Sequence, residues 1–353
     1  MDAFAVILAG GSGTRFWPAS RRSLPKQYLP IGAAEPLVAQ TLARLEGLIP
    51  LDRILVVSAQ SQREELQRAL PRLPRENLLL EPCGRNTAAS VAWAALEIRR
   101  RNPNAVHVVL PADHVIRPAE SLRASLGAGL DEARESRALV TFGVRPTRAS
   151  TGFGYLELGE ALPARGNHGV HRVRRFVEKP VQERADEFLK SGRYLWNAGI
   201  FAWRTDAILS AFERHGPGLL RALESFPTGA ELEHAYGALP VVSIDVCVLE
   251  RESDVRTLPI DYFWSDVGAW TALEDVLAPD ANGNRSTGGT LLETLDASDN
   301  LVYGEDGQLV ALLGVDNLVV VRAGDAVLIT TRERADQVRA LVERMHAARS
   351  PFV

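Results

Sequence analysis

Residues 4–18 read FAVILAGGSGTRFWP, an apolar run that leads directly into a turn with three glycines. Residues 4–9 predict a buried strand, and the glycines that follow let backbone N–H groups approach an anion closely. Arg15 and, further along, Lys26 add full positive charges. The segment is not a Walker loop, because no Gly-Lys-Ser/Thr follows, and Phe16 stands where a dinucleotide fingerprint has its third glycine. The start of the chain therefore predicts a phosphate-binding turn of another kind.

Strand-like and helix-like segments alternate after this turn. The strands are short, almost continuously apolar runs, and segments with helical periodicity separate them. This alternation predicts a mostly parallel sheet that is covered by helices on both faces. The expected strands are residues 53–58, 77–80, 105–110, 138–143 and 174–177, and the expected helices are residues 62–70, a helix beginning at 86 or 87, and residues 122–136.

The pattern of residue types along the sequence changes at about Asn284. From there on, short β-rich pieces are separated by Gly, Asp and Asn, which predicts a small module of stacked strands. An amphipathic pattern over residues 332–347 predicts a closing helix. Because the module shows no clustered charges, we expect it to serve stability or assembly and not chemistry. Its expected strands are residues 290–294, 301–303, 310–312, 318–322 and 326–330.

The composition is that of an ordinary globular protein. The 353 residues, 46% hydrophobic and 24% charged, suffice for one large α/β domain and a smaller one. A net charge of −4 gives no reason to expect a nucleic-acid partner. No apolar run approaches the roughly 20 residues that span a bilayer, and the apolar N-terminus lacks the basic leader of a signal peptide. Cys83 and Cys247 lack metal or redox spacing, so we expect a cytoplasmic protein with two reduced thiols.

The glycine turn and its continuation to Pro25-Lys26-Gln27 resemble the signature of mannose-1-phosphate guanylyltransferases. The resemblance covers essentially the whole chain, since further blocks follow in the family's order. It implies a doubly wound, Rossmann-like α/β nucleotidyltransferase domain over residues 1–283. A small C-terminal β-helical module with its closing helix would occupy residues 284–353. The further blocks are residues 81–88, 111–114, 152–155, 176–180, 196–201 and 264–270.

The resemblance implies a reaction between two small phosphorylated substrates. GMP would pass from GTP to mannose 1-phosphate, giving GDP-mannose and pyrophosphate, with a divalent cation such as Mg²⁺. Two alternatives stay open. One is a nucleotidyltransferase for another sugar 1-phosphate, such as glucose or heptose. The other is a non-catalytic relative that binds sugar nucleotides and regulates a partner. A homodimer is also left open, and neither nucleic acid nor a membrane is an expected partner.

Asp113 and Asp266 are the candidate metal ligands. Asp113 follows an apolar strand, so its carboxylate lies at the carboxyl end of the sheet, where open α/β sheets bind ligands. A carboxylate there suits Mg²⁺, which takes one or two carboxylates together with phosphate oxygens. Taken alone, Asp113 reads equally well as a turn or cap residue, and Asp266 as part of a packed turn. The resemblance assigns both residues to the metal.

The scarcity of lysine singles out two positions. Of 40 basic residues only Lys26, Lys179 and Lys190 are lysines, and the first two lie inside motifs. Lysine offers a compact charge, whereas arginine presents a wide planar fork. The pattern therefore predicts a tight phosphate pocket at each of the two motif lysines. The resemblance places Lys26 on the triphosphate and Lys179 on the sugar phosphate.

The remaining candidates divide between the two substrates. Asn197 and Gly199 resemble a sugar-binding turn, because an Asn side chain both donates to and accepts from hydroxyls. Asn86 and Thr87 read equally well as caps of the helix that they begin. The full nucleotide set is Leu8, Ala9, Gly10, Gly11, Ser12, Gly13, Thr14, Arg15, Lys26, Arg85, Asn86, Thr87 and Asp113. The sugar-phosphate set is Gly154, Tyr155, Glu178, Lys179, Asn197 and Gly199.

The expected chemistry needs no general base. Its nucleophile is a phosphate oxygen, which is largely ionised at pH 7 because the second pKa of a phosphate monoester is about 6. The protein mainly has to bring two polyanions together, which requires cations and N–H donors more than proton transfer. The resemblance implies Arg15, Lys26, Asp113 and Lys179 as catalytic residues. Of these, Arg15 and Lys26, with the amides of residues 10–13, would hold the departing pyrophosphate.

Overall fold

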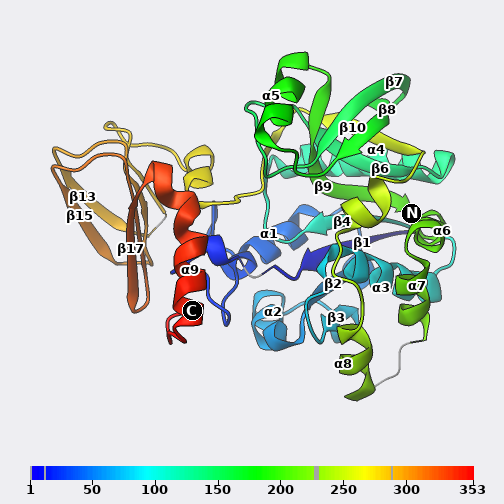
Figure 1. The fold of residues 1–353 in the computed structure, drawn as a ribbon, viewed down its shortest axis with the longest axis horizontal. Coiled ribbons are helices and arrows are strands. Elements are labelled where there is room, and N and C mark those ends of the chain that lie inside the picture. The colour runs from blue at the N-terminus through cyan, green and yellow to red at the C-terminus, as the bar shows by residue number, and fades with distance from the viewer. Residues whose placement is uncertain (1, 12, 226–229, 288) are drawn as a thin grey trace.

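The computed structural model describes residues 2–11, 13–225, 230–287 and 289–353. A nine-stranded sheet forms the centre of its larger part (Figure 1). Strands 168–177 and 194–204 run opposite to the others, so the sheet is mostly parallel, as predicted. In spatial order the strands are β3 (Leu78–Glu81), β2 (Ile54–Ala59), β1 (Ala3–Ala9), β4 (Val106–Pro111), β9 (Tyr194–Arg204), β6 (Leu139–Val144), β10 (Val255–Ile260), β8 (His168–Val177) and β7 (Tyr155–Arg165).

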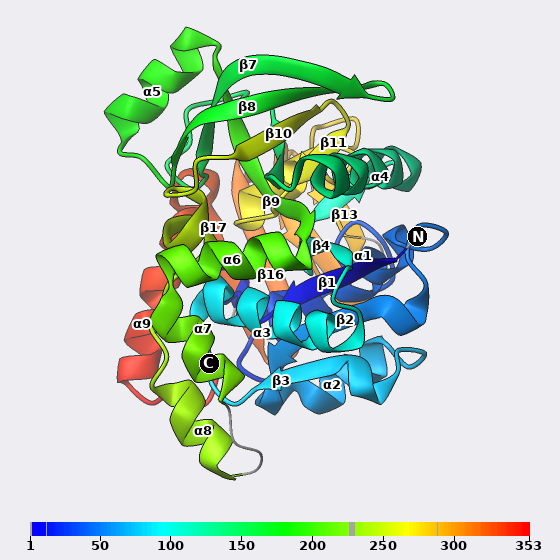
Figure 2. The ribbon, with the colours of Figure 1, turned by 90° about the vertical axis from the view of Figure 1, so that its right-hand side faces the viewer.

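The first strand shows why the sheet is buried on both faces. Successive side chains of a strand point to opposite faces of the sheet. All residues of β1 are apolar, so both of its faces are apolar. Phe4 and Val6 belong to one apolar cluster, and Ala5 and Ile7 to another. The first cluster includes residues of α3 (Asn86–Arg101), α6 (Thr205–His215) and α7 (Pro217–Glu224), which lie together over one face (Figure 2). The second includes residues of α1 (Leu37–Arg44), α2 (Arg63–Ala69) and α4 (Ala119–Ser136).

Most predicted elements of this domain lie within a few residues of their observed positions. Strand β9 is the exception. Its segment was expected to contain a sugar-binding turn, and the structure places Asn197 and Gly199 inside the strand. The expectation of a turn is wrong because Gly199 adopts a φ of 68° and the register with β6 shifts nearby, so the chain makes a bulge without leaving the sheet. The other elements of this domain are β5 (Val115–Arg117), α5 (Gln182–Ser191), α8 (Ala230–Gly237) and β11 (Phe263–Ser265).

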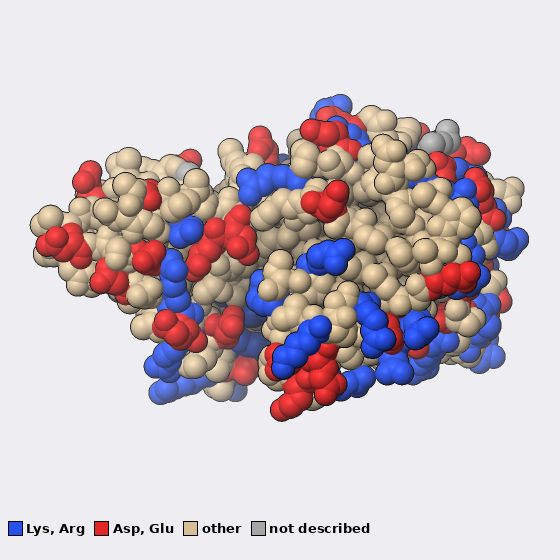
Figure 3. Space-filling view, turned by 90° about the horizontal axis from the view of Figure 1, so that it is seen from above, with Lys and Arg blue, Asp and Glu red and all other residues tan. Residues whose placement is uncertain are grey.

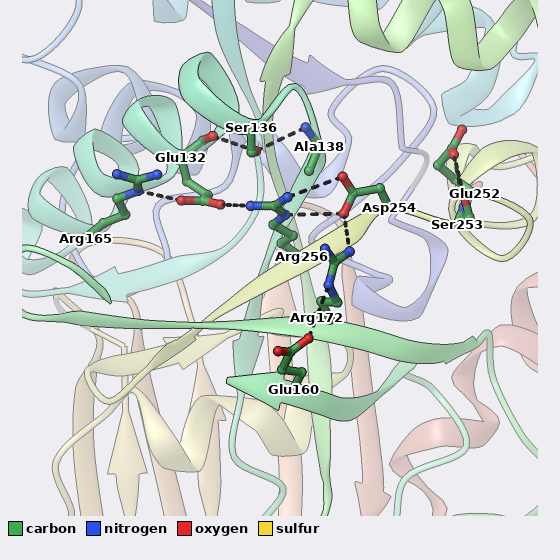
Figure 4. Close-up of polar contacts among 10 residues, drawn as sticks. All are labelled: Glu132, Ser136, Ala138, Glu160, Arg165, Arg172, Glu252, Ser253, Asp254 and Arg256. Carbon is green, nitrogen blue, oxygen red and sulfur yellow. Dashed lines mark hydrogen bonds and ion pairs between the residues drawn. The ribbon is translucent and has the colours of Figure 1, made fainter. Parts of the chain in front are cut away.

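A network of ion pairs fastens α4 to the strands β7, β8 and β10 (Figure 4). Glu132 of α4 is buried, and its carboxylate accepts hydrogen bonds from Arg165 of β7 and Arg256 of β10. Arg256 also pairs with Asp254, which pairs with Arg172 of β8. A buried carboxylate of this kind depends on its cationic partners. The network therefore holds the antiparallel strands β7 and β8 against α4 and β10.

The C-terminal part is a module of stacked strands, as predicted. Two small sheets form it, one in the order β12-β14-β16-β17 and one that pairs β13 with β15. Asn284 and Asn300 are buried on successive coils, and the side-chain amide of Asn300 donates to the Asn284 Oδ1 at 3.0 Å. The strands are β12 (Arg285–Ser286), β13 (Leu291–Leu295), β14 (Leu301–Tyr303), β15 (Leu309–Leu313), β16 (Leu318–Ala323) and β17 (Ala326–Thr331).

The predicted closing helix begins with a 3₁₀ turn, Arg332–Gln337, and continues as the α-helix α9 (Val338–Ala347). Its buried side chains, Val338 and Val342, join an apolar cluster that also contains Phe16 and Trp17 of the first turn. The module is therefore packed directly against the segment with which the chain begins.

Within the described ranges, no helix is long and apolar enough to cross a membrane. Figure 3 shows one face of the molecule, on which Lys and Arg side chains mingle with Asp and Glu. The charges in that view do not gather by sign into one broad surface.

Candidate active site

The turn after β1 is closed by contact with the segment around Lys26. Gly13 has a φ of 61°, and a Cβ atom there would lie 2.5 Å from the Lys26 Cβ. Ser20 Oγ donates to the Gly13 carbonyl at 2.5 Å, and Gln27 Nε2 donates to the Ala9 carbonyl at 2.8 Å. Glycine is therefore required at position 13 by both backbone conformation and space. Ser12, predicted to bind the nucleotide, lies outside the described residues.

Lys26 connects the two residues that are the candidate metal ligands. Its side chain is buried, and its Nζ donates to Asp113 Oδ2 at 2.8 Å and to the backbone carbonyl of Asp266 at 2.6 Å. These three residues line one cavity of about 510 Å³, the first cavity. Arg15 lines it too, exposed, and makes no ion pair within the part of the chain that the structure describes. Lys26 is thus buried in the wall of this cavity, and its role in phosphate binding stays a prediction.

The electrostatics around Asp113 favour its charged form. Burial alone would raise the pKa of this carboxyl, but Lys26 and His114 together lower it below its ordinary value. His114 behaves in the opposite way, since burial lowers the pKa of its imidazole. The His114 Nδ1 accepts a hydrogen bond from the indole of Trp264 at 3.2 Å. The cavity therefore has a carboxyl group of lowered pKa beside an imidazole whose pKa is also lowered.

The segment 265–268 contains a strained residue, Val267, directly after Asp266. Val267 is fully buried and has a φ of 44°, which is rare for a β-branched residue. A Cβ atom at Gly268 would lie 2.8 Å from Asp266 Oδ2, so glycine leaves room for that carboxylate. Strain of this kind persists where surrounding structure enforces it, and it clusters at functional sites.

The donor set fits a magnesium ion. Asp113 and Asp266 line the same cavity, and Mg²⁺ is usually held by one or two carboxylates together with substrate phosphates. Within the described ranges, no cluster of three or more His, Cys, Asp or Glu side chains could hold a metal by itself. A magnesium ion at Asp113 and Asp266 would therefore need further ligands from the substrate, and it stays a prediction.

A second cavity of about 320 Å³ meets the first at Asp113. The glycine turn forms one wall, and the start of α3 forms another. Most of the predicted nucleotide residues line one of the two cavities. Gly13, Thr14, Arg15 and Lys26 line the first, Leu8, Ala9, Gly10, Gly11, Arg85, Asn86 and Thr87 line the second, and Asp113 lines both.

The start of α3 is held by contacts from several segments. Arg85, the residue before the helix, makes no side-chain cap hydrogen bond. The Asn86 Oδ1, however, accepts from the backbone N–H of Thr87 at 2.8 Å, a contact with the first helical turn that agrees with the capping alternative. Thr87 Oγ1 accepts a hydrogen bond from the backbone N–H of Ile244 at 2.9 Å. The Arg85 guanidinium donates to the carbonyls of residues 236 and 237 at the end of α8.

Glu81 and Asp245 also line the second cavity, although neither was predicted as a site residue. Glu81 is buried, and its Oε1 accepts hydrogen bonds from the hydroxyls of Tyr236 and Ser90. Burial raises its pKa. Burial and the charge of Glu178 likewise raise the pKa of Asp245 to about 7. The signal that could have found Glu81 is its place at the end of β3, where the carboxyl-edge rule that identified Asp113 also applies.

Asn197 is oriented by hydrogen bonds on both ends of its amide. Its Oδ1 accepts from Thr141 Oγ1 at 2.7 Å, and its Nδ2 donates to Asp245 Oδ1 at 3.0 Å. Gly199 lies two residues further along the bulge and lines the second cavity. These contacts bring the predicted sugar residues next to the predicted nucleotide residues.

The other predicted sugar-phosphate residues differ in how far they are exposed and in what they contact. Lys179 has a φ of 44°, and its side chain is 61% exposed, with Nζ 2.9 Å from Glu178 Oε1. The tight pocket predicted around Lys179 is thus wrong, because a left-handed turn directs this side chain outward. Tyr155 is fully buried, and its hydroxyl accepts from the Ser150 N–H at 2.9 Å, so it supports the segment and lines neither the first nor the second cavity. Gly154 adjoins Glu178, whose Oε2 would lie 2.6 Å from a Cβ at that glycine.

A cluster of aromatic side chains lies beside the first cavity. The ring of Phe153 packs against Trp196 and Trp264, with centroid distances of 4.8 and 5.4 Å. Trp264 also contacts His114 of the first cavity. Phe153 thus supports the site through tilted and edge-on aromatic contacts.

The chain is similar to known proteins over nearly its full length. Residues 4–283 match the nucleotidyl transferase family, and residues 294–345 match the MannoseP isomerase/GMP-like beta-helix domain. A mannose-1-phosphate guanylyltransferase of Klebsiella pneumoniae is 37% identical over 348 residues, which cover 96% of this chain and 73% of the relative. Its counterpart from Salmonella typhimurium is 36% identical, with coverages of 98% and 73%.

A solved structure agrees with these sequence matches. A crystal structure from Thermus thermophilus, described as a mannose-1-phosphate geranyltransferase, has a TM-score of 0.89 and 38% identity. The match covers 98% of this chain and all of that one. The chain therefore belongs to the mannose-1-phosphate guanylyltransferase family of nucleotidyltransferases.

Proposed function

We propose that this protein transfers GMP from GTP to mannose 1-phosphate, releasing pyrophosphate and forming GDP-mannose. The observation that supports this best is the meeting of two cavities at Asp113, one lined by Lys26 and both aspartates, the other by the glycine turn and α3. The named relatives are mannose-1-phosphate guanylyltransferases. A non-catalytic relative would have little reason to retain this convergence of a buried lysine and two carboxylates.

The proposed reaction is an in-line displacement. A phosphate oxygen of mannose 1-phosphate forms a bond to the α-phosphorus of GTP, and the bond from that phosphorus to the β-bridging oxygen breaks. The electron pair leaves with pyrophosphate, and no proton has to move. Lys26 and Arg15 stabilise the charge of the leaving group, as cations and N–H donors do in transfers of this kind. A Mg²⁺ ion held by Asp113 and Asp266 would supply further neutralisation of the phosphate oxygens.

Glu81 gives a physical reason why the site would select a guanine base. Its Oε1 is occupied by two hydroxyl donors, whereas its Oε2 makes no hydrogen bond within the described part of the chain. That oxygen approaches Gly10, where a Cβ would lie 3.4 Å away. Guanine presents an N1–H and an amino group that a carboxylate can accept, while adenine presents an acceptor at N1. A buried acceptor left without a partner is costly, so this carboxylate favours GTP over ATP.

The sugar-side residues are proposed to act together. Asn197 and Asp245 form a hydrogen-bonded pair that can bind hydroxyl groups. The proposed role of Lys179, whose Nζ lies 2.9 Å from Glu178 Oε1, is to neutralise the sugar phosphate. Both cysteines are free, which accords with the cytoplasmic location that we propose. The homodimer stays a prediction.

A substrate matrix tests the proposal. Pyrophosphate release is measured with GTP, ATP, UTP and dTTP, each combined with the 1-phosphates of mannose, glucose and heptose. We expect the highest kcat/KM for GTP with mannose 1-phosphate, and no release when Mg²⁺ is removed. A higher kcat/KM with another pair would replace the proposed substrates. No release with any pair would contradict the proposed enzymatic function altogether.

A further inference from the structure

The first cavity has a wall that comes from the C-terminal module. Four residues of α9 line it, namely Arg339, Val342, Glu343 and His346, opposite the turn that contains Arg15. Their spacing of three, four and seven residues places them on one face of the helix. The expectation that this module takes no part in the chemistry does not account for this face.

The position of α9 relative to the phosphate turn is fixed by several contacts. Val342 is buried with Phe16 and Trp17. The Trp17 indole donates to the backbone carbonyl of Phe352 at 2.8 Å, and the Trp270 indole donates to the carbonyl of Trp17 at 3.1 Å. The apolar side of α9 is thus anchored beside the turn, and its polar side is held at the cavity.

The cavity needs cations beyond those that the larger domain supplies. The Lys26 ammonium already has two acceptors, the Asp113 carboxylate and the Asp266 carbonyl. Arg15 is the other cation of the larger domain on the cavity lining. Arg339 adds a guanidinium, whose Nε donates to Glu343 Oε1 at 2.9 Å. Both side chains are exposed, and an exposed pair of this kind on a helix is weak, so a phosphate dianion can displace Glu343.

The order of the two cavities indicates which phosphates reach α9. In a nucleotide the base, the ribose and the phosphates are linked in that order. The proposed base site is the second cavity. Asp113, where the cavities meet, then lies at the α-phosphate. The β- and γ-phosphates extend into the first cavity, between Arg15 and α9.

We propose that Arg339 binds the terminal phosphates of the nucleoside triphosphate, which leave as pyrophosphate, and that Glu343 competes with them for this guanidinium. The C-terminal module then contributes a binding residue to the active site. This inference rests on the proposed function, since it takes a nucleoside triphosphate as the substrate.

The experiment measures binding of inorganic pyrophosphate and of GTP to the full chain by titration calorimetry. Arg339→Ala should weaken both by on the order of tenfold, as expected for the loss of a charge-assisted hydrogen bond to phosphate. Glu343→Gln should leave both unchanged or strengthen them, because the guanidinium loses its competitor. Arg344→Ala is the matched control, since Arg344 is also exposed on α9 but does not line the cavity, and it should bind both as the wild type does.

Wild-type affinity for both ligands in Arg339→Ala would overturn the inference and leave the proposed function intact. An equal loss in Arg344→Ala would also overturn it, since it would indicate a general effect of surface charge. Failure of the wild-type chain to bind pyrophosphate or any nucleoside triphosphate would overturn the inference and the proposed function together. Thermal melts of each variant confirm that binding is measured on folded protein.

Discussion

Replacing Gly13 with alanine tests the geometry of the phosphate turn. The new Cβ would lie 2.5 Å from the Lys26 Cβ and 2.9 Å from its backbone nitrogen. Carbon atoms pack best at about 3.5–4.0 Å, so the turn and the lysine segment must separate by roughly 1 Å. The lysine cannot yield freely, because its Nζ is held by Asp113 and by the Asp266 carbonyl. Displacement of about 1 Å in a catalytic arrangement can cost roughly 10²-fold.

We therefore expect Gly13→Ala to lower kcat/KM by about 10²-fold, measured as pyrophosphate release. Overpacking should also lower the free energy of unfolding by about 1–3 kcal/mol. Gly47→Ala is the control, because Gly47 has a φ of 84° but no atom within 4 Å of an added Cβ. This variant should carry the conformational cost alone and keep its kcat/KM. The reasoning is refuted if Gly13→Ala folds and turns over within twofold of the wild type.

Three further outcomes are expected. Asp113→Asn and Asp266→Asn should each lower kcat by on the order of 10²–10³-fold, as loss of a transition-state charge stabiliser does, and normal turnover with Mg²⁺ would remove both from the metal site. Glu132→Ala should lower the free energy of unfolding by about 3 kcal/mol in urea, since it leaves Arg165 and Arg256 without their buried partner, with kcat unchanged at permissive temperature; a loss below about 1 kcal/mol would contradict this. Asp245 has a folded-state pKa of about 7, above its ordinary value of 3.8, so its contribution to stability is present below about pH 4 and is lost as the pH rises through about 7. Thermal melts should show the wild type losing stability relative to Asp245→Asn over that window, and parallel curves would refute the assignment.

Much of the larger domain could be predicted from local patterns. The apolar run of β1 predicted a buried strand, which is present in the structure. The glycine turn after it lines both cavities, and the anion site expected there stays a prediction. Asp113 could be located because the carboxyl ends of parallel strands share one edge of a sheet. The same rule applied to Glu81 would have added a residue of the second cavity.

What could not be predicted depends on contacts between distant segments. Strand β9 was missed because Asn197 and Gly199 interrupt its apolar pattern, and only pairing with β4 and β6 keeps the segment in the sheet. The outward direction of Lys179 follows from a left-handed backbone conformation that the residue type does not indicate. The place of α9 at the first cavity results from packing on Phe16 and Trp17, more than 300 residues earlier in the chain.

The central claim is that a phosphate oxygen of the sugar phosphate attacks the α-phosphorus of the nucleotide in these cavities. It is tested most directly with mannose 1-phosphate in which the oxygen that bridges C1 and phosphorus is oxygen-18. Mass spectrometry of the products then shows where the label resides. The account predicts that all of the label is retained in GDP-mannose and that unlabelled pyrophosphate is released in equal amount. Label in inorganic phosphate would mean that the C1–oxygen bond breaks, and it would contradict the account.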